Sequence, residues 1–577
     1  MKNLPVVLLL FICSLFGLCK TYAQNLTPYE IGNGNQSTTF EDMRKFYQEL
    51  SKQFSTISYE TKGEDDNHFP IDVVTFNPSE QSLAESRRNK SVLFINNGIH
   101  PGEPDGIDAT MMLMRDLAVG KIKAPENVII AAIASYNVSG MLNRGGFSRA
   151  NQNGPEEYGF RGNSRNYDLN RDFIKTDTKN SRSFQQIFHW IKPDVFIDNH
   201  VSNGADYQYI FTYISTNKER LGRALGNYFN DQMQNTLLKD LAKGGFISVP
   251  YVNIHNDVPD VGFPVFMDSP RYATGYTSLF NVIGTVVETH MLKSYKERVK
   301  ATYDYMWHSL NFMDRNHLII QQKRMENLRQ YRMGEKYPIA WRLDSTQFNN
   351  LDFRGFEAKY KPSEVSSKNR LWYDREAKFS KRVKLYNTYV PTKEIIIPKY
   401  YVIPQSEWKI IDLLKLNQIE MVPMRQDSTI AVEQYRIKDF KTSPIPYEGH
   451  YLHSETYVLK EFKSMKFRAG DILVPLNQNG VKFLLETLEP EAIDSYFNWN
   501  FFDAILGQKE YYSAYVFEDT AAKLLKEDSH LKAAFEREKA NNPKFADDGR
   551  AQLDWVYRHS NYYEKSHLLY PIFRIVN

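Results

Sequence analysis

The segment that decides the fold spans residues 94–103 and reads FINNGIHPGE. It begins in an apolar run, passes through turn-forming glycine and proline residues, and contains His100 and Glu103. A short apolar run bounded by such residues predicts a buried β-strand that ends in a turn. In that turn, a histidine and a glutamate three residues apart can converge on one cation. Roughly one such pair is expected by chance in a chain of this composition, so the pair alone is weak evidence.

Comparable apolar runs recur through the first half of the chain. Residues 128–133, 195–197 and 282–287 are apolar, and residues 107–119 follow a helical pattern. Continuous apolar strands separated by helices are typical of a sheet that is covered on both faces. We therefore expect an α/β fold with a mixed, mostly parallel sheet flanked by helices.

Two more of these predicted strands end in side chains that suit a metal site. His200 follows the run at 195–197, and Glu288 follows the two valines at 286–287. Open α/β sheets place their ligand sites at the carboxyl ends of strands, so His100, Glu103, His200 and Glu288 should meet at one rim. Two histidines and one glutamate suit Zn²⁺ with a fourth position open to water. The joint arrangement is far stronger evidence than any one residue.

The N-terminus predicts a secretory signal peptide over residues 1–23. A lysine starts it, a short apolar run follows, and small residues end it at Ala23. Both cysteines, Cys13 and Cys19, lie within it, so the mature chain would hold any metal through His, Asp or Glu. We expect a secreted or periplasmic protein. Lipid attachment at Cys19 is the less favoured alternative, because Leu18 is the wrong size just before such a cysteine.

Length and charge bound the remaining possibilities. A chain of 577 residues is too long for one hydrophobic core, and we expect an α/β domain over 24–325 and a smaller α+β region of unknown role over 326–577. A formal net charge of +3 argues against a nucleic-acid partner. No segment after the signal peptide has the unbroken apolar length of a membrane span. The sequence leaves the oligomeric state open.

The order of motifs resembles the zinc carboxypeptidase family, the carboxypeptidase A-like metallopeptidases, over about residues 90–292. That family carries a His-x-x-Glu pair, an Asn-Arg pair, a later histidine and a final glutamate. The similarity is greatest to bacterial secreted members with a C-terminal extension. The matching residues here are His100 and Glu103, Asn170 and Arg171, His200, and Glu288.

The resemblance implies one Zn²⁺ per chain, held by His100, Glu103 and His200, with Glu288 as the general base that activates water. It also implies that Asp168 orients the first zinc histidine. An upstream arginine would stabilise the oxyanion. The best match for that arginine is Arg161, and the alternatives are Arg149 and Arg165.

The resemblance further implies a peptide substrate with a free C-terminus, whose carboxylate Asn170 and Arg171 would bind. The family's mobile tyrosine has no counterpart, because Phe266 stands near its place. Side-chain specificity therefore cannot be transferred. The nearest substitutes are Tyr272 and Tyr276, and Arg271 is a further candidate for substrate binding.

Two other functions stay open from the sequence. One is a zinc amidase or deacylase that acts on cell-wall peptides or N-acyl amino acids. The other is a catalytically silent protein that binds peptide or glycan. Outside the motif set, His290 is interpreted as structural, and a second metal site at His450 and His453 is disfavoured because their surroundings suggest a strand or loop.

Overall fold

The computed structural model describes residues 25–79, 81–255 and 257–576. The predicted signal peptide and both cysteines lie outside these ranges, so that prediction remains untested. In the described part, β3 (Ser91–Asn96) is fully buried, as its apolar sequence predicts. It lies near the middle of an eight-stranded sheet whose strand order is β1-β2-β4-β3-β5-β9-β6-β7.

This sheet is mixed, as predicted. Strands β4, β3, β5 and β9 run parallel to one another, whereas β1 and β2 pair antiparallel at one edge and β6 joins β9 antiparallel. The bounds of the other strands are β1 (Ile57–Glu64), β2 (Pro70–Phe76), β4 (Val128–Ile133), β5 (Val195–Ser202), β6 (Phe211–Ser215), β7 (Ser248–Pro250) and β9 (Ile283–His290). The carboxyl ends of the parallel strands face one rim.

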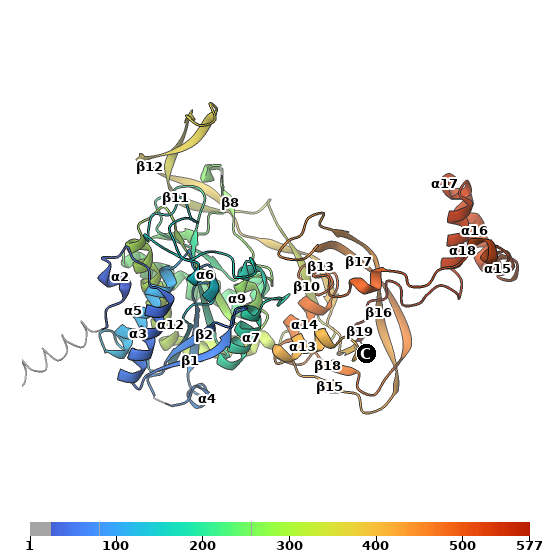
Figure 1. Ribbon diagram of the computed structural model, residues 1–577, viewed down its shortest axis with the longest axis horizontal. Coiled ribbons are helices and arrows are strands. Elements are labelled where there is room, and N and C mark those ends of the chain that lie inside the picture. Colours follow the sequence, from blue (N-terminus) through green and yellow to red (C-terminus); the bar gives the residue numbers. More distant parts are fainter. Residues whose placement is uncertain (1–24, 80, 256, 577) are drawn as a thin grey trace, which may run out of the picture.

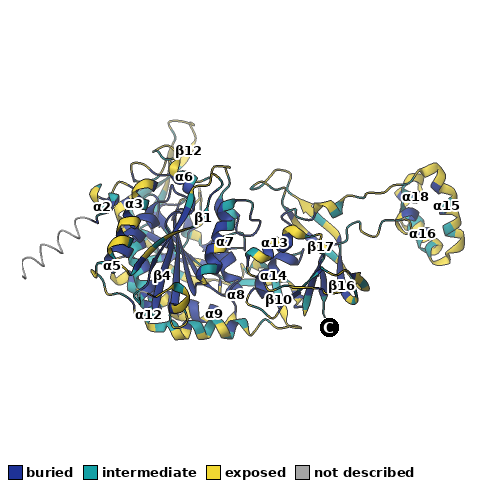
Figure 2. Cartoon of the chain, turned by 60° about the horizontal axis from the view of Figure 1, so that its bottom comes forward, coloured by how far each residue is buried: buried dark blue, intermediate teal, exposed yellow. Residues whose placement is uncertain are grey.

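Helices cover both faces of the sheet, and Figure 2 shows the buried residues concentrated in the strands between them. On one face, α5 (Asp105–Ala118) packs against α12 (Tyr295–Leu328). On the other lies α7 (Lys179–Ile191), where the Phe184 ring contacts Phe94 and Phe196 of the strands. Helix α3 (Phe40–Gln53) begins at the N-cap Thr39, whose side chain accepts a hydrogen bond from the Asp42 backbone.

The C-terminal region contains both helices and sheets, which confirms the α+β prediction. Its largest sheet has six strands in the order β15-β18-β14-β19-β16-β17. The bounds are β14 (Tyr400–Ile403), β15 (Val422–Pro423), β16 (Ser428–Thr442), β17 (His453–Phe467), β18 (Ile472–Pro475) and β19 (Phe573–Ile575), with α13 (Trp408–Leu416) and α14 (Val481–Leu488) packed nearby.

Two parts of this region project from the body of the molecule (Figure 1). One is the long hairpin of β11 (Asn349–Pro362) and β12 (Asn369–Tyr386), which also pairs with β8 (Phe263–Pro264). The other is a helical cluster with its own small apolar core. Its members are α15 (Ala514–Glu527), α16 (Ser529–Asn541), α17 (Pro543–Ala546) and α18 (Gly549–Arg558). Strands β10 (Lys336–Leu343) and β13 (Tyr389–Ile396) pair near the base of the hairpin.

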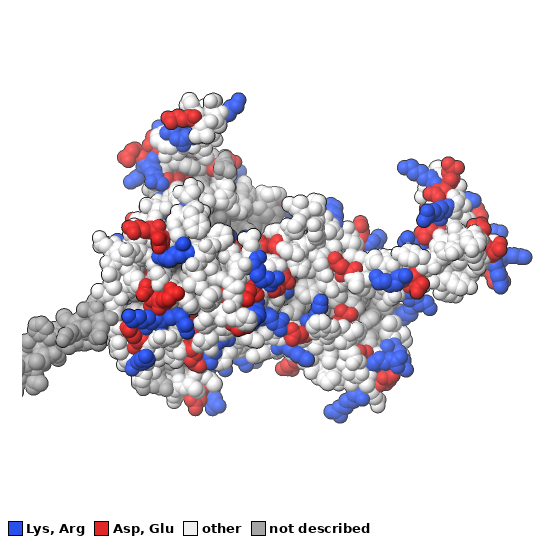
Figure 3. Space-filling view, in the orientation of Figure 1, with Lys and Arg blue, Asp and Glu red and all other residues white. Residues whose placement is uncertain are grey.

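Charged side chains of both signs are interspersed over the face that Figure 3 shows. No large patch of one sign gathers there. Among the described residues, no helix is both long enough and apolar enough to cross a membrane.

A buried arginine ties helix α12 to the loop beyond the sheet. The Arg298 side chain is fully buried, and its Nε lies 3.3 Å from a carboxylate oxygen of Asp105. Its other nitrogens donate to the backbone carbonyls of Asn153, Gly154 and Lys293 at 2.9–3.0 Å. The loop that contains Asn153 and Gly154 also carries Arg149 and Arg161, two candidate arginines of the predicted site. The contact with Arg298 therefore helps to position them.

Replacing Arg298 by Ala is expected to lower the free energy of unfolding by about 3–5 kcal/mol, because it leaves a buried carboxylate and several carbonyls unpaired. Urea denaturation followed by circular dichroism measures the change. Lys300→Ala is the matched control on the same helix, since Lys300 is exposed and its ion pair with Asp304 lies at the surface. Equal stabilities of the two variants would contradict the assigned role.

Candidate active site

A cavity of about 740 Å³ opens at the carboxyl ends of β3, β5 and β9. His100 and Glu103 reach it from the turn after β3, and His200 reaches it from β5. Glu288 lies on β9 directly beside His200 in the register of the parallel pair. The fold thus brings together the four residues that the strand-end rule selects.

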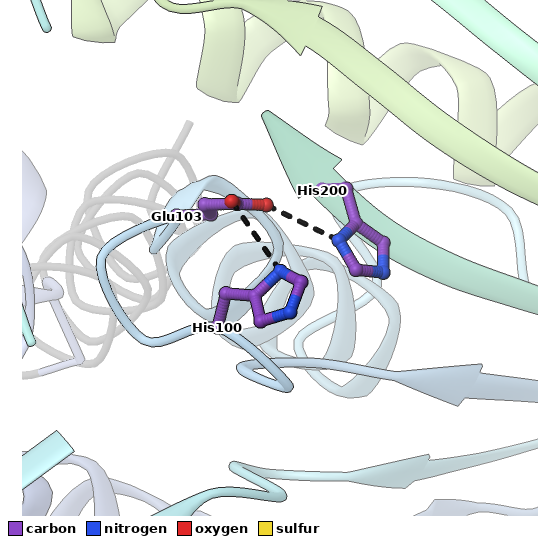
Figure 4. A group of neighbouring side chains, drawn as sticks. All are labelled: His100, Glu103 and His200. Carbon is purple, nitrogen blue, oxygen red and sulfur yellow. Dashed lines mark hydrogen bonds and ion pairs between the residues drawn. The ribbon is translucent and has the colours of Figure 1, made fainter. Parts of the chain in front are cut away.

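The two histidines and Glu103 form one compact cluster (Figure 4). Glu103 lies between the rings, with its oxygens 3.4 Å from Nδ1 of His100 and 3.1 Å from Nδ1 of His200. All three side chains are at most 4% exposed. The Val201 backbone N–H also donates to Glu103 at 2.8 Å, which holds the carboxylate in place.

A second carboxylate holds the far side of each imidazole. Nε2 of His100 lies 2.9 Å from Asp168, and Nε2 of His200 lies 2.9 Å from Asp198. These contacts favour the tautomer in which Nε2 carries the proton and Nδ1 can bind a metal. Nδ1 of His100 is buried without a hydrogen bond. Two such nitrogens and one carboxylate are a donor set that fits Zn²⁺.

The electrostatics of the cluster suit a cation. Burial would raise the pKa of Glu103, but Arg149 and His100 more than offset it and hold the pKa well below its usual value. Burial raises the pKa of Glu288 to about 8, and Glu103 adds to the rise while His200 and Arg149 oppose it. A dication at the cluster would favour the ionised form of Glu288.

Two of the three candidate oxyanion arginines line the cavity. The guanidinium of Arg149 donates to Glu103 at 2.7 Å and to the Val201 carbonyl at 3.0 Å. Arg161 is 47% exposed and pairs with Asp168 at 2.9 Å. The structure does not bring Arg165 to the cavity, because its guanidinium turns to the carbonyl of Asp177.

Asn170 and Arg171 also line the cavity, on the short helix η1 (Leu169–Arg171). Asp168 caps this helix by accepting from the Asn170 backbone N–H at 2.9 Å. The Arg171 guanidinium lies over the Tyr272 ring at 4.6 Å, and its nearest carboxylate, Asp168, is 3.8 Å away. One guanidinium nitrogen of Arg171 donates to the Asn170 carbonyl at 2.7 Å, and the side chain lines the cavity wall.

Of the remaining predicted substrate residues, only Tyr272 lines the cavity, where it packs edge to face against Phe266. Tyr276 differs from expectation, because helix α11 (Ala273–Ser278) turns it inward. There it is fully buried, and its hydroxyl donates to Asn417. Arg271 is likewise not among the lining residues, since Asp494 binds its Nε at 2.7 Å.

Several cavity residues escaped the sequence-based prediction. Tyr251, Asn253 and His255 come from the segment after the three-residue strand β7, which is too short to give a periodic signal. Asp268 is buried, accepts from the Thr274 hydroxyl, and has its pKa raised to about 6 by burial. Asp198 could have been found, because it precedes His200 by two residues and so shares a face of the strand.

His290, His450 and His453 each have a partner outside the His100–Glu103–His200 cluster. His290 contacts the Ala205 carbonyl at 3.0 Å, and burial lowers its pKa to about 4. His450 pairs with Asp177 at 2.8 Å, and His453 pairs with Asp503 at 3.1 Å. Within the described ranges, His100, Glu103 and His200 form the only group of three such residues placed to hold a metal.

The chain is similar in sequence to known carboxypeptidases. Over 169 residues it is 25% identical to carboxypeptidase 2 of Trichophyton tonsurans, covering 28% of this chain and 28% of that protein. Carboxypeptidase 2 of Trichophyton rubrum matches to the same extent. The chain thus spans little more than a quarter of the length of these relatives. The matches confirm the resemblance to carboxypeptidases that the motifs indicate.

Among solved structures, a metallo-carboxypeptidase from Burkholderia cenocepacia aligns with a TM-score of 0.36 and 14% identity, over 49% of this chain and 70% of that one. No protein-family model matches the sequence.

Proposed function

We propose that this chain is a zinc-dependent metallocarboxypeptidase that hydrolyses the last peptide bond of peptides with a free C-terminus. The observation that carries the proposal is one cavity that joins the His100–Glu103–His200 cluster, the buried Glu288 and the guanidinium of Arg171. A metal site, a proton acceptor and an anion-binding group are the three parts that this reaction requires.

His100, Glu103 and His200 would hold the metal through two Nδ1 atoms and a carboxylate. Zn²⁺ supplies a Lewis acid that activates water at neutral pH. Asp168 and Asp198 keep the rings oriented by binding their Nε2 atoms. These donors are buried and face one another, so the site is already organised for a small cation.

Glu288 would act as general base and acid. Its carboxylate accepts the proton of the attacking water and then passes it to the nitrogen of the departing amino acid. Its position beside His200 on the neighbouring strand supports this role. Arg161 would stabilise the negative charge that develops on the carbonyl oxygen, and Arg149 lines the same wall.

Asn170 and Arg171 would bind the substrate's terminal carboxylate. A planar guanidinium binds a carboxylate through two parallel hydrogen bonds, and the Asp168 carboxylate lies 3.8 Å from Arg171, beyond hydrogen-bond distance. The cavity volume of about 740 Å³ is within the range of small-molecule sites. It suits the end of a peptide.

Arg171→Ala is expected to raise the KM for peptides with a free C-terminus by about 10–100-fold, because charge-assisted hydrogen bonds contribute about 1.5–3 kcal/mol. Amidated peptides should be affected much less. Steady-state kinetics on matched peptide acids and amides measure the difference. Arg165→Ala is the control from the same loop, since Arg165 lies outside the cavity. An unchanged preference for free acids in Arg171→Ala would contradict the assignment.

The proposal as a whole is tested by mass spectrometry of a mixed peptide library with free and amidated C-termini. Loss of single residues from free ends alone would support it and would reveal the side-chain preference. Hydrolysis of N-acyl amino acids or cell-wall peptides without peptide trimming would favour the deacylase or amidase alternative. Binding of peptide or glycan without any hydrolysis would favour the silent binding protein.

A further inference from the structure

A tight turn of the C-terminal region packs against the loop that carries Asn170 and Arg171. This turn connects β16 to β17, and the backbones of Tyr447 and His450 exchange two hydrogen bonds of 2.8 and 3.1 Å across it. Its central residues, Glu448 and Gly449, have φ angles of 48° and 85°. Such turns favour Asn or Gly at both central positions, so the glutamate is unusual there.

The glutamate of this turn makes a specific contact with the site. Its Oε2 accepts a hydrogen bond of 2.9 Å from the backbone N–H of Asp168. Asp168 in turn binds His100 at 2.9 Å and caps the helix that carries Asn170. Glu448 therefore holds the one backbone unit that connects the predicted metal ligand to the predicted carboxylate-binding pair.

Residues next to Glu448 also hold the turn in place, through contacts with the loop and with Trp499. His450 pairs with Asp177 at 2.8 Å. A Cβ at Gly449 would lie only 2.6 Å from the hydroxyl of Tyr167, so the turn packs closely against the loop. The ring of Tyr447 stacks on Trp499 with centroids 6.3 Å apart.

A second contact from the C-terminal region supports the same wall. Asp494 accepts from both the backbone N–H and the Nε of Arg271, at 3.0 and 2.7 Å. Arg271 immediately precedes Tyr272, whose ring lies under the Arg171 guanidinium. The loop and the ring that surround Arg171 are thus each held by a carboxylate from the C-terminal region.

We propose that Glu448 is a positioning residue for substrate binding, and that the C-terminal region supports the carboxylate-binding wall of the cavity without lining it. The inference rests on the proposed function, because it assigns Arg171 to the substrate. The inference assigns a role to the C-terminal region, for which the sequence motifs indicate no function. The contact acts through the backbone of Asp168, so Glu448 itself need not touch the substrate.

Three variants of the full chain test this role. Glu448→Gly removes the acceptor and at the same time relaxes a backbone at φ 48°. Glu448→Gln keeps an oxygen that can accept from Asp168. Glu455→Gly is the matched control, because Glu455 also has φ 48° but is exposed and pairs with Lys441 in a strand.

In metal-free protein, hydrogen exchange of the amides at residues 166–172 should be at least about tenfold faster in Glu448→Gly than in the parent. It should be unchanged in Glu448→Gln and Glu455→Gly. With metal added, Glu448→Gly should raise the KM for free-acid peptides by about tenfold and change kcat less. Both effects follow from a loosened loop with its side chains intact.

Unchanged exchange at residues 166–172 in Glu448→Gly would overturn the proposal, and so would an equal acceleration in Glu455→Gly. Faster exchange with an unchanged KM would also overturn it, because the contact would then be structural only. If the parent protein cleaves no peptide at all, the proposed function fails, while the exchange measurement still shows whether Glu448 holds the loop.

Discussion

Glu288→Gln is expected to retain the metal and to lower kcat by about 10²–10⁴-fold, the usual contribution of a general base. The amide has nearly the same shape as the carboxylate but cannot accept the proton of water. Glu288 lies beside His200 without belonging to the metal-ligand cluster, so its replacement should leave metal binding intact. Peptide hydrolysis and metal content per chain are measured on the same preparation.

An exposed glutamate serves as the control for this change. Glu364 is exposed in the turn that connects strands β11 and β12, and Glu364→Gln should match the parent in both measurements. Unchanged hydrolysis in Glu288→Gln would move the role of base to another residue. Loss of the metal in Glu288→Gln would instead mean that this carboxylate is a ligand.

His200→Ala is expected to abolish metal binding and hydrolysis together. It removes one of three donors and leaves Glu103 and Asp198 buried without their shared partner. Removing an outer partner such as Asp198 typically weakens a metal site by about 10–100-fold, and removing a ligand should cost more. Zinc titration and metal content after dialysis measure the loss.

The same variant has a readout that does not depend on turnover. A metal bound only by the folded parent stabilises it by about 2.7 kcal/mol at a hundred times its dissociation constant, so added zinc should raise the melting temperature. His200→Ala should show no such rise, whereas His530→Ala, which changes an exposed histidine, should behave as the parent does. A zinc-dependent shift in His200→Ala would refute the ligand assignment.

Local patterns were sufficient for much of the fold. The apolar runs at residues 128–133 and 282–287 became buried strands, and the helical pattern at residues 107–119 became helix α5. These signals are local, because a strand or helix that must bury a face shows it in its own residues. The convergence of His100 and His200 followed from the strand-end rule, which needs only the strand directions.

Side-chain direction beyond the strands could not be predicted in this way. Tyr276 and Arg271 lie close in sequence to Tyr272, yet only Tyr272 lines the cavity. A short helix turns Tyr276 into the core, and Asp494 draws Arg271 away. Both outcomes depend on partners that are distant in the chain, which no local pattern contains.

By itself, the sequence determined the side chains of the candidate site: two histidines and a glutamate without a cysteine, and a second glutamate on the next strand. Only the tertiary structure decided which neighbours hold those side chains in place. The hydrogen bond between Glu448 and Asp168 joins residues that are 280 positions apart. Such a contact arises only when the C-terminal region packs against the loop in the folded chain, and neither segment alone carries a signal of it.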